Sequence, residues 1–226
     1  MIRRVTTNDA PDLLRSPSGE SVVWAVADAD PLPAWVAADA LTPSELERVA
    51  RTTHPQARAQ FVRGRTVLRA ALGVRLALPP HSVPLVLTAD GKPVLDPAIG
   101  FDLHFNVSHT DGVALFAVGP VPVGVDVEVH RDGRDLFGLV DRFFTPDERE
   151  QFRALPAELR AAAFLRGWTG KEAILKGVGC GVRELANCAV DLDPRRPPAV
   201  RRSPDGADWK LTGWVEAEVA FAVAVR

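Results

Sequence analysis

The run at residues 123–129 reads Val-Gly-Val-Asp-Val-Glu-Val, with a valine at every second position. Successive side chains of a strand point to opposite faces, so the valines share one face while Asp126 and Glu128 share the other. We therefore predict a strand anchored in the core by its valines. Two adjacent carboxylates repel each other, and burying either one alone is costly. A divalent cation would resolve both problems, and a solvent-facing acidic edge is the alternative that this pattern leaves open.

Proline and glycine signals divide the chain near residue 120, where Gly119-Pro120-Val121-Pro122 is the strongest boundary signal. Hydrophobic periodicity predicts strands and helices on both sides of it. The expected strands cover 21–27, 85–88, 102–107, 112–118, 123–129, 211–215 and 218–225, and the expected helices begin at 42 or cover 55–72, 146–152 and 158–176. We predict an α+β fold of two related α/β lobes, 1–120 and 121–226, closely packed as one structural unit, although no sequence repeat is visible.

The first lobe contains a clear helix start at Thr42-Pro43-Ser44-Glu45. Thr42 is the expected N-cap, Pro43 suits the first helical position, and Glu45 stands three residues after the cap. The longer helix that follows is expected to end at Gly73. Most of its arginines are expected to form its solvated face.

A third acidic residue of interest, Glu172, lies in the helix that contains Trp-Thr-Gly-Lys-Glu-Ala-Ile-Leu-Lys at residues 168–176. At 3.6 residues per turn, Glu172 falls inside the apolar sector formed by Phe164, Trp168 and Leu175. A carboxylate aimed into a core must be paired, protonated or bound to a metal. A surface pair between Glu172 and Lys176 is the simpler alternative, and the helical wheel disfavours it.

Asp126, Glu128 and Glu172 together offer three oxygen ligands, which suit a hard cation such as Mg²⁺. This ion keeps several waters and often takes further ligands from substrate phosphates, whose oxygens lysines and arginines would bind. The set therefore indicates chemistry on a phosphorylated substrate. The chain has no G-x-x-x-x-G-K-[ST] phosphate loop, and Cys180 and Cys188 lack the spacing of zinc ligands.

Composition excludes several other classes of function. The 226 residues hold 27 Lys and Arg against 29 Asp and Glu, a net charge of −2, so neither a nucleic-acid nor a membrane partner is expected. Two cysteines cannot form a disulfide framework, and no apolar run reaches the roughly 18 residues of a membrane span. The first residues lack the apolar core of a signal peptide. We therefore expect a cytoplasmic protein with reduced thiols.

Four motifs resemble the signatures of 4′-phosphopantetheinyl transferases: F-N-V-S-H at 105–109, G-V-D-V-E at 124–128, R-F-F-T-P-D-E at 142–148 and W-T-G-K-E-A-I-L-K at 168–176. The resemblance covers about residues 41–192 and is greatest to the surfactin-synthetase-type (Sfp-type) branch. It implies a monomeric pseudo-dimer of two similar α/β lobes, with the active site in the cleft between them.

The resemblance also implies the reaction. Coenzyme A would be the co-substrate, with Mg²⁺ on its pyrophosphate held by Asp126, Glu128 and Glu172. Glu172, directly or through a metal-bound water, would deprotonate a serine of an apo acyl or peptidyl carrier protein. That serine would attack the β-phosphate and release 3′,5′-ADP, while Lys176 would stabilise the charge developing on the pyrophosphate.

The same resemblance assigns further cofactor-binding residues. His109 would hold the 3′-phosphate, Ser108 would contact the cofactor, and Lys92 would be the basic residue after the turn at 89–93. Ser108 and His109 could touch one ligand together at a turn, but on a strand they would point in opposite directions. The remaining phosphate-binding bases match less closely; the chosen residues are Arg48, Arg58 and Arg65, and Arg51, Arg63 and Arg69 stay open.

The carrier-docking surface and the pathway are less defined by the sequence. The resemblance implies an acidic carrier, for which Phe137, Phe143, Phe144 and residues 146–152 are candidate contacts, with packing between the lobes as the alternative. Fatty-acid, polyketide and nonribosomal-peptide carriers are not distinguished. A Mg²⁺-dependent phosphohydrolase using the same carboxylates and a non-catalytic carrier-binding module are the alternative functions.

Overall fold

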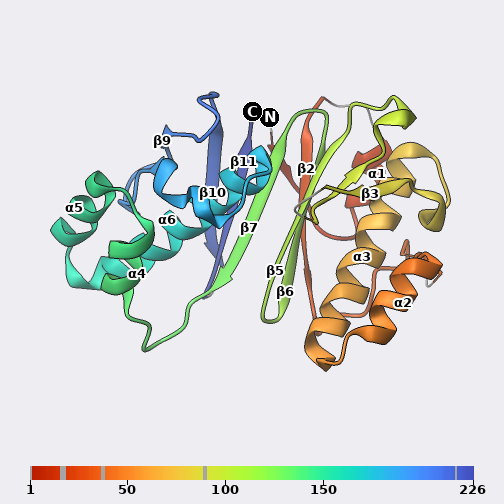
Figure 1. Ribbon diagram of the computed structural model, residues 1–226, viewed down its shortest axis with the longest axis horizontal. Helices are drawn as coiled ribbons and strands as arrows, with labels where there is room; N and C mark the ends of the chain where they lie inside the picture. Colours follow the sequence, from red (N-terminus) through yellow and green to blue (C-terminus); the bar gives the residue numbers. More distant parts are fainter. Residues whose placement is uncertain (1, 16–18, 37–38, 89–90, 217) are drawn as a thin grey trace. The chain divides into compact units, whose positions relative to one another are not determined.

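The computed structural model describes residues 2–15, 19–36, 39–88, 91–216 and 218–226. The chain divides into two compact units, unit 1 (Met1–Pro120) and unit 2 (Val121–Arg226). In Figure 1 unit 1 runs from red to yellow-green and unit 2 from green to blue. Helices and strands are mixed in both units, so the predicted α+β class is confirmed.

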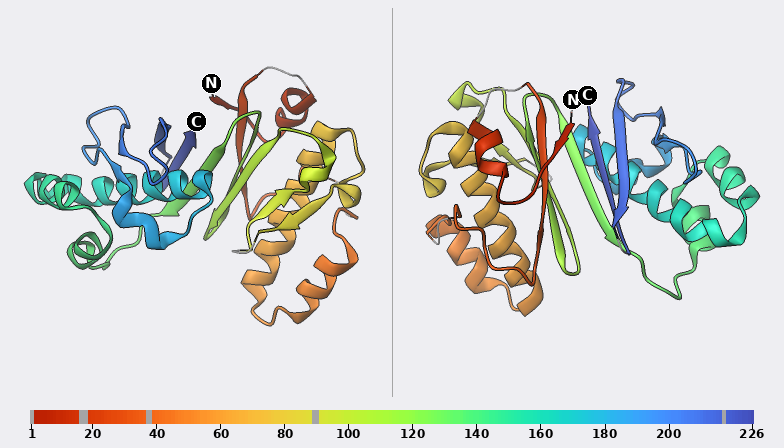
Figure 2. Two further views of the ribbon diagram at one scale, coloured as in Figure 1. Left: turned by 45° about the horizontal axis from the view of Figure 1, so that its top comes forward. Right: turned by 180° about the vertical axis from the view of Figure 1, so that it is seen from behind.

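Unit 1 is built on a four-stranded sheet in the order β1-β2-β6-β5, in which β1 runs parallel to β2 and the other pairs are antiparallel. The longest helix, α3, lies across one face of this sheet (Figures 1 and 2). Between them lies a core in which the Trp24 and Phe116 rings stack 5.4 Å apart. The elements are β1 (Ile2–Arg4), α1 (Ala10–Arg15), β2 (Ser21–Ala27), α2 (Pro43–Arg51), α3 (Pro55–Leu76), β3 (Leu85–Leu87), β4 (Pro93–Leu95), β5 (His104–Thr110) and β6 (Val113–Gly119), with short 3-10 turns at Pro80–Ser82 and Pro97–Ile99.

Two expectations for unit 1 are corrected. Helix α3 continues past Gly73 and ends at Ala77, which adopts the left-handed conformation with φ 54°. A Cβ atom on Gly73 would lie 2.7 Å from the backbone oxygen of Leu78, so this glycine permits a close approach of the chain and does not stop the helix. Strand β5 extends through Ser108 and His109, which the sequence placed at a turn. In the predicted turn at 89–93, Ala89 and Asp90 lie outside the described residues.

Unit 2 contains an antiparallel sheet in the order β10-β11-β7, with helix α6 packed along it (Figures 1 and 2). The valine face of β7 is buried as predicted, because Val125 and Val127 are almost wholly covered. The elements are β7 (Val123–Val129), α4 (Leu136–Phe143), α5 (Pro146–Ala154), α6 (Ala157–Val178), the 3-10 helix Val182–Asn187, β8 (Ala189–Val190), β9 (Val200–Arg202), β10 (Lys210–Glu216) and β11 (Val219–Val225).

A helix-capping clamp occurs in both units. The Thr-Pro-x-Glu segments at 42–45 and 145–148 each form a capping box, in which the glutamate carboxylate accepts the backbone N–H of the threonine at 2.9 and 2.8 Å. The same carboxylate binds a buried cation from the long helix of its unit: Arg69 Nε at 2.7 Å in unit 1 and Lys171 Nζ at 2.6 Å in unit 2. The capping box of unit 1 is the one that the sequence predicted. The structure thus reveals a repeated device that the sequence did not make visible.

Candidate active site

Strand β7 and helix α6 bring the three predicted acidic residues into one region of unit 2. Asp126 is only 3% exposed, although the valines occupy the other face of its strand, so the alternative of a solvent-facing edge is wrong for this residue. Lys176 donates a hydrogen bond from Nζ to Asp126 Oδ1 at 2.6 Å and thereby joins α6 to β7. Glu172 lies one helical turn before Lys176 and is half-buried.

The charges of these residues act on one another. Burial raises the pKa of Glu172; Lys176 opposes this effect, while Asp126 and Glu128 add to it. Burial also raises the pKa of Glu128, as does the neighbouring Asp126, whereas Arg134, Lys176 and a hydrogen bond with the Trp168 side chain lower it. Carboxylates influence each other in this way only at short range. The three acidic side chains therefore share one electrostatic environment in which full ionisation is unfavourable.

This donor set fits a hard divalent cation, because such ions bind carboxylate oxygens and relieve the repulsion between them. Among the residues that the structure describes, no group of three or more His, Cys, Asp or Glu side chains is arranged as a formed metal site. The positive charge that the structure provides next to Asp126 is the ammonium group of Lys176. The metal-binding role of the three carboxylates accordingly stays a prediction.

A pocket of about 190 Å³ in unit 1 gathers three of the predicted cofactor-binding residues. Arg65 from α3, Lys92 next to β4 and His109 from β5 line it, together with the apolar side chains of Phe61 and Phe105. Ser108 does not line this pocket, because neighbouring residues of a strand point to opposite sides; Ser108 is 4% exposed, whereas His109 is exposed. The two residues thus cannot face one ligand together, as they could at a turn.

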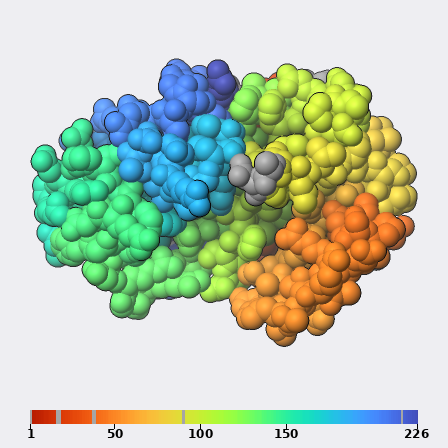
Figure 3. Space-filling view, in the orientation of Figure 1, coloured from red at the N-terminus to blue at the C-terminus, as the bar shows by residue number. Residues whose placement is uncertain are grey.

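The other arginines of unit 1 fall into separate environments. A neighbouring pocket of about 560 Å³ is lined by Arg48, Arg51, Arg65, Arg69 and His81. The Arg48 guanidinium lies 4.4 Å above the centre of the Phe61 ring. In the space-filling view, α2 and the start of α3 (orange) form part of the outer surface of unit 1 (Figure 3).

The predicted Arg58 lies apart from these residues, in a pocket with Asp28, Gln56 and Arg63. Arg63, which the sequence left open, donates to the backbone oxygens of Ala27 and Asp30 at 2.6 and 2.8 Å. These contacts give Arg63 a role in holding the loop after β2.

Lys171 is a residue whose role sequence reasoning missed. It precedes Glu172 in the helical motif, yet its side chain is 0% exposed, and Nζ donates to Glu148 Oε2 and to the Phe143 oxygen at 3.1 Å. Glu148 also accepts the backbone N–H of Val190 at 2.9 Å. Lys171 thus connects α6 to α5, to the end of α4 and to β8. The Thr-Pro-Asp-Glu capping box was the available signal, because its glutamate needs a partner when buried.

The aromatic residues considered for carrier docking have different positions. Phe144 and Phe152 are wholly buried in the core of unit 2, so their assignment to a docking surface is wrong, and they pack within one unit. Phe143 packs edge-on against Trp168, and Phe137 is 45% exposed beneath the guanidinium of Arg160. A groove of about 530 Å³ lies beside them; its lining includes Glu128, Arg134, Leu139, Arg142 and Trp168.

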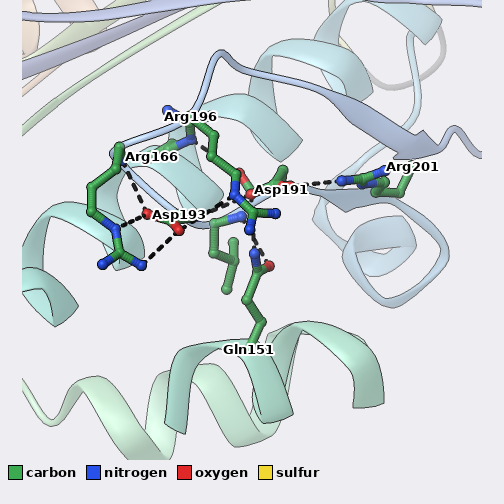
Figure 4. A network of polar contacts seen from close by, with 8 residues as sticks. Gln151, Arg166, Asp191, Asp193, Arg196 and Arg201 are labelled. Atoms are coloured by element: carbon green, nitrogen blue, oxygen red, sulfur yellow. Dashed lines mark hydrogen bonds and ion pairs between the residues drawn. The ribbon is translucent and has the colours of Figure 1, made fainter. Parts of the chain in front are cut away.

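A polar network attaches the segment after β8 to helices α5 and α6 (Figure 4). Gln151 donates to Asp191 Oδ1 at 3.0 Å, and Arg166 Nε donates to the backbone oxygen of Asp191 at 3.0 Å. Arg201 binds the second oxygen of the Asp191 carboxylate at 2.7 Å. Neighbouring Asp193 is held by Arg195, which donates from Nε and Nη2, both at 2.8 Å. Gln151 belongs to the segment 146–152 considered for carrier docking, but no predicted catalytic, cofactor-binding or metal-binding residue belongs to this network, which we regard as structural.

The buried acidic strand beside Glu172 and Lys176 in unit 2, and the cationic pocket in unit 1, are the features that the sequence predicted for an enzyme that acts on phosphorylated substrates. The family model of the 4′-phosphopantetheinyl transferase superfamily matches residues 122–225. The chain is 38% identical over 186 residues to the 4′-phosphopantetheinyl transferase HetI of Nostoc, covering 81% of this chain and 78% of that protein. A 4′-phosphopantetheinyl transferase of Bacillus subtilis is 28% identical over 82% of this chain and 81% of its own length. The chain belongs to the 4′-phosphopantetheinyl transferase superfamily.

A third relative is the L-aminoadipate-semialdehyde dehydrogenase-phosphopantetheinyl transferase of Homo sapiens, 32% identical over 79% of this chain and 62% of that protein. The described helices include none that is both long and apolar enough to cross a membrane.

Proposed function

We propose that this 4′-phosphopantetheinyl transferase moves the phosphopantetheine group of coenzyme A to a serine of an apo acyl or peptidyl carrier protein and releases 3′,5′-ADP. The observation that supports this most strongly is the joint environment of Asp126, Glu128 and Glu172: Asp126 accepts a hydrogen bond from the Lys176 ammonium, and burial together with the neighbouring carboxylates raises the pKa of Glu128 and of Glu172. Relatives named as phosphopantetheinyl transferases support the same reaction.

In unit 2, Asp126, Glu128 and Glu172 would hold Mg²⁺, which when bound supplies positive charge to the pyrophosphate of the substrate. Glu172 accepts the proton of the carrier serine, directly or through a metal-bound water, because its carboxylate lies beside Asp126 and Lys176 at the proposed reaction site. Lys176 stands against Asp126 and stabilises negative charge developing on the phosphates. These roles assign proton transfer and charge stabilisation to adjacent turns of α6.

In unit 1, Arg65, Lys92 and His109 would bind the nucleotide phosphates of coenzyme A, because they gather at one pocket beside two aromatic rings. Arg48 in the neighbouring pocket would extend this cationic surface. Arg58 and Ser108 lie outside both pockets, so their predicted contacts with the cofactor receive less support.

A groove in unit 2 supports an assignment of the surface that binds the carrier protein. The acidic carrier would dock near the groove that contains Arg134 and Arg142, whose guanidinium groups suit acidic side chains. The Sfp-type branch, a monomeric state, a cytoplasmic location and the absence of nucleic-acid or membrane partners stay predictions.

Incubation of the protein with coenzyme A, Mg²⁺ and a panel of apo carrier proteins tests the proposal. We expect the mass of a carrier to increase by one phosphopantetheine group, with stoichiometric formation of 3′,5′-ADP. Release of inorganic phosphate without carrier modification would favour a phosphohydrolase. Carrier binding without any reaction would favour a non-catalytic module. The carrier that is modified fastest identifies the pathway class.

A further inference from the structure

The two elements that carry the acidic site, β7 and α6, meet at a point where no side chain separates them. A Cβ atom on Gly124 of β7 would overlap the backbone oxygen of Ala173 and the backbone nitrogen of Gly177, and it would lie 2.8 Å from Gly177 Cα. All three atoms belong to the backbone of α6, which cannot rotate aside as the end of a side chain can. The strand and the helix are thus in direct backbone contact.

Space, and not backbone conformation, requires glycine at position 124. Gly124 is absent from the glycines of this chain with positive φ, so its backbone conformation is open to other residues. Gly177 lies inside α6, where glycine is a poor helix former. A Cβ atom on Gly177 would lie 2.6 Å from two ring atoms of Trp209 and 3.2 Å from the backbone nitrogen of Gly124. Both glycines therefore serve the same close crossing.

This crossing lies next to the acidic residues on both elements. Gly124 precedes Asp126 by two residues on β7, Ala173 follows Glu172, and Gly177 follows Lys176. The backbone separation at the crossing consequently fixes the separation of Glu172 from Asp126. Metal ligands tolerate errors of only about 0.2 Å in their distances, whereas an added methyl group would displace the helix by more than this.

We propose that Gly124 and Gly177 are positioning residues, which set the β7–α6 spacing and thereby the mutual placement of Asp126, Glu128 and Glu172 for a divalent cation. This inference rests on the proposed function, because that function supplies the cation. It assigns a task to two glycines that carry no chemistry of their own.

The test compares Gly124→Ala and Gly177→Ala in the full chain, using Mn²⁺ binding followed by electron paramagnetic resonance and the Mg²⁺ concentration that gives half-maximal transfer. We expect Gly124→Ala to bind Mn²⁺ about 10- to 100-fold more weakly, as when support of metal ligands is lost. The required Mg²⁺ should rise in parallel, while the KM for coenzyme A, measured at saturating Mg²⁺, stays within about twofold. The smaller effect is expected for Gly177→Ala, because its Cβ would lie 3.2 Å from the β7 backbone, whereas that of Gly124 would overlap the α6 backbone.

Gly170→Ala is the matched control on the same helix, because its Cβ would meet only side-chain ends: a Leu211 methyl group at 3.0 Å and two Val190 methyl groups at the ordinary contact distance of 3.8 Å. It should keep the Mn²⁺ affinity of the unaltered chain. Unchanged Mn²⁺ affinity in folded Gly124→Ala overturns the inference. If Gly124→Ala does not fold, Gly177→Ala decides, and unchanged affinity there overturns it equally. An unaltered chain that neither binds Mn²⁺ nor modifies a carrier refutes the proposed function itself.

Discussion

Helices α3 of unit 1 and α6 of unit 2 invite comparison, because each has 22 residues, ends at a left-handed residue and packs on a sheet. Each also sends one buried cation to the glutamate of a Thr-Pro-x-Glu capping box. In unit 1 that glutamate, Glu45, lies beside a pocket and also pairs with Arg65 at 3.4 Å. In unit 2, Glu148 and Lys171 are both buried, and a backbone N–H uses the remaining carboxylate oxygen.

The difference shows how one local device serves two purposes. In unit 1 the clamp glutamate holds Arg65 and Arg69 beside a pocket, whereas in unit 2 the clamp joins α6 to α5, to the end of α4 and to β8. Under the proposed function, the chemistry of unit 2 comes instead from β7 and from Glu172, the residue that follows the clamp lysine. In that proposal unit 1 supplies cations for a nucleotide and unit 2 supplies carboxylates for a metal.

The largest expected effect tests the carboxylates of unit 2. Asp126→Ala and Glu172→Ala should each lower the rate of carrier modification at least about a thousandfold, about 4 kcal/mol in activation free energy, because proton transfer and charge stabilisation are lost. Carrier mass measured against time checks this result, and circular dichroism should show an intact fold. Undiminished turnover by well-folded Glu172→Ala would remove the assignment of this residue as the base.

The next effect compares the two clamps. Lys171→Ala should lower the free energy of unfolding by about 3–5 kcal/mol, because it leaves the Glu148 carboxylate buried without its partner. Arg69→Ala should cost less, about 1–3 kcal/mol, since Arg65 remains near Glu45. Urea denaturation measures both variants. Equal losses would show that the two clamps are energetically alike and would break the comparison.

A smaller effect is expected from the phosphate-binding pocket of unit 1. Arg65→Ala and Lys92→Ala should each raise the KM for coenzyme A about tenfold, about 1.4 kcal/mol, with kcat changed much less, because in the proposed function they bind phosphates away from the reacting atoms. Dephospho-coenzyme A, which lacks the 3′-phosphate, is the matched substrate for His109→Ala. If His109→Ala prefers coenzyme A over dephospho-coenzyme A by the same factor as the unaltered enzyme, His109 does not bind the 3′-phosphate.

The smallest effect concerns the exposed arginines of the network in Figure 4. Hydrogen bonds from Arg195 lower the pKa of Asp193 to about 2 from its ordinary value of 3.8. The resulting stabilisation is present above pH 3.8 and is lost as the pH falls towards 2. Arg195→Ala should return the pKa of Asp193 towards 3.8 in a carboxyl NMR titration, with only a small fall of Tm at pH 7, because the pair is exposed. A pKa that stays near 2 would mean that other groups hold the carboxylate.

Local sequence patterns predicted much of the fold. The alternation of valines identified β7 and its buried face, and the Thr-Pro-Ser-Glu segment identified the start of α2, because strand alternation and helix capping depend on neighbouring residues. Predicted ends of elements were less accurate. Gly73 did not end α3. The chain turns back at the left-handed Ala77 and brings the backbone oxygen of Leu78 close to Gly73, so glycine is needed for this approach and not as a stop signal.

The candidate site was predicted to a similar extent. Helical periodicity predicted that Glu172 points towards the core. The partner of Lys176, in contrast, depends on the packing of α6 against β7, and in the structure this partner is Asp126. The surface roles expected for Phe144 and Phe152 failed because aromatic residues at helix ends can face either the core or the solvent. The Thr-Pro-Asp-Glu capping box indicated a glutamate that needs a partner when buried, but not that Lys171 is this partner, since the two residues belong to different helices.

The amino-acid sequence by itself determined the family, the order of helices and strands, and the identity of the acidic residues, because these depend on residue types and on short spacings. Tertiary structure decided which lysine is buried, where the arginines gather and how closely β7 approaches α6. Those properties depend on contacts between residues distant in the chain, and the available space at each crossing is set by both partners together.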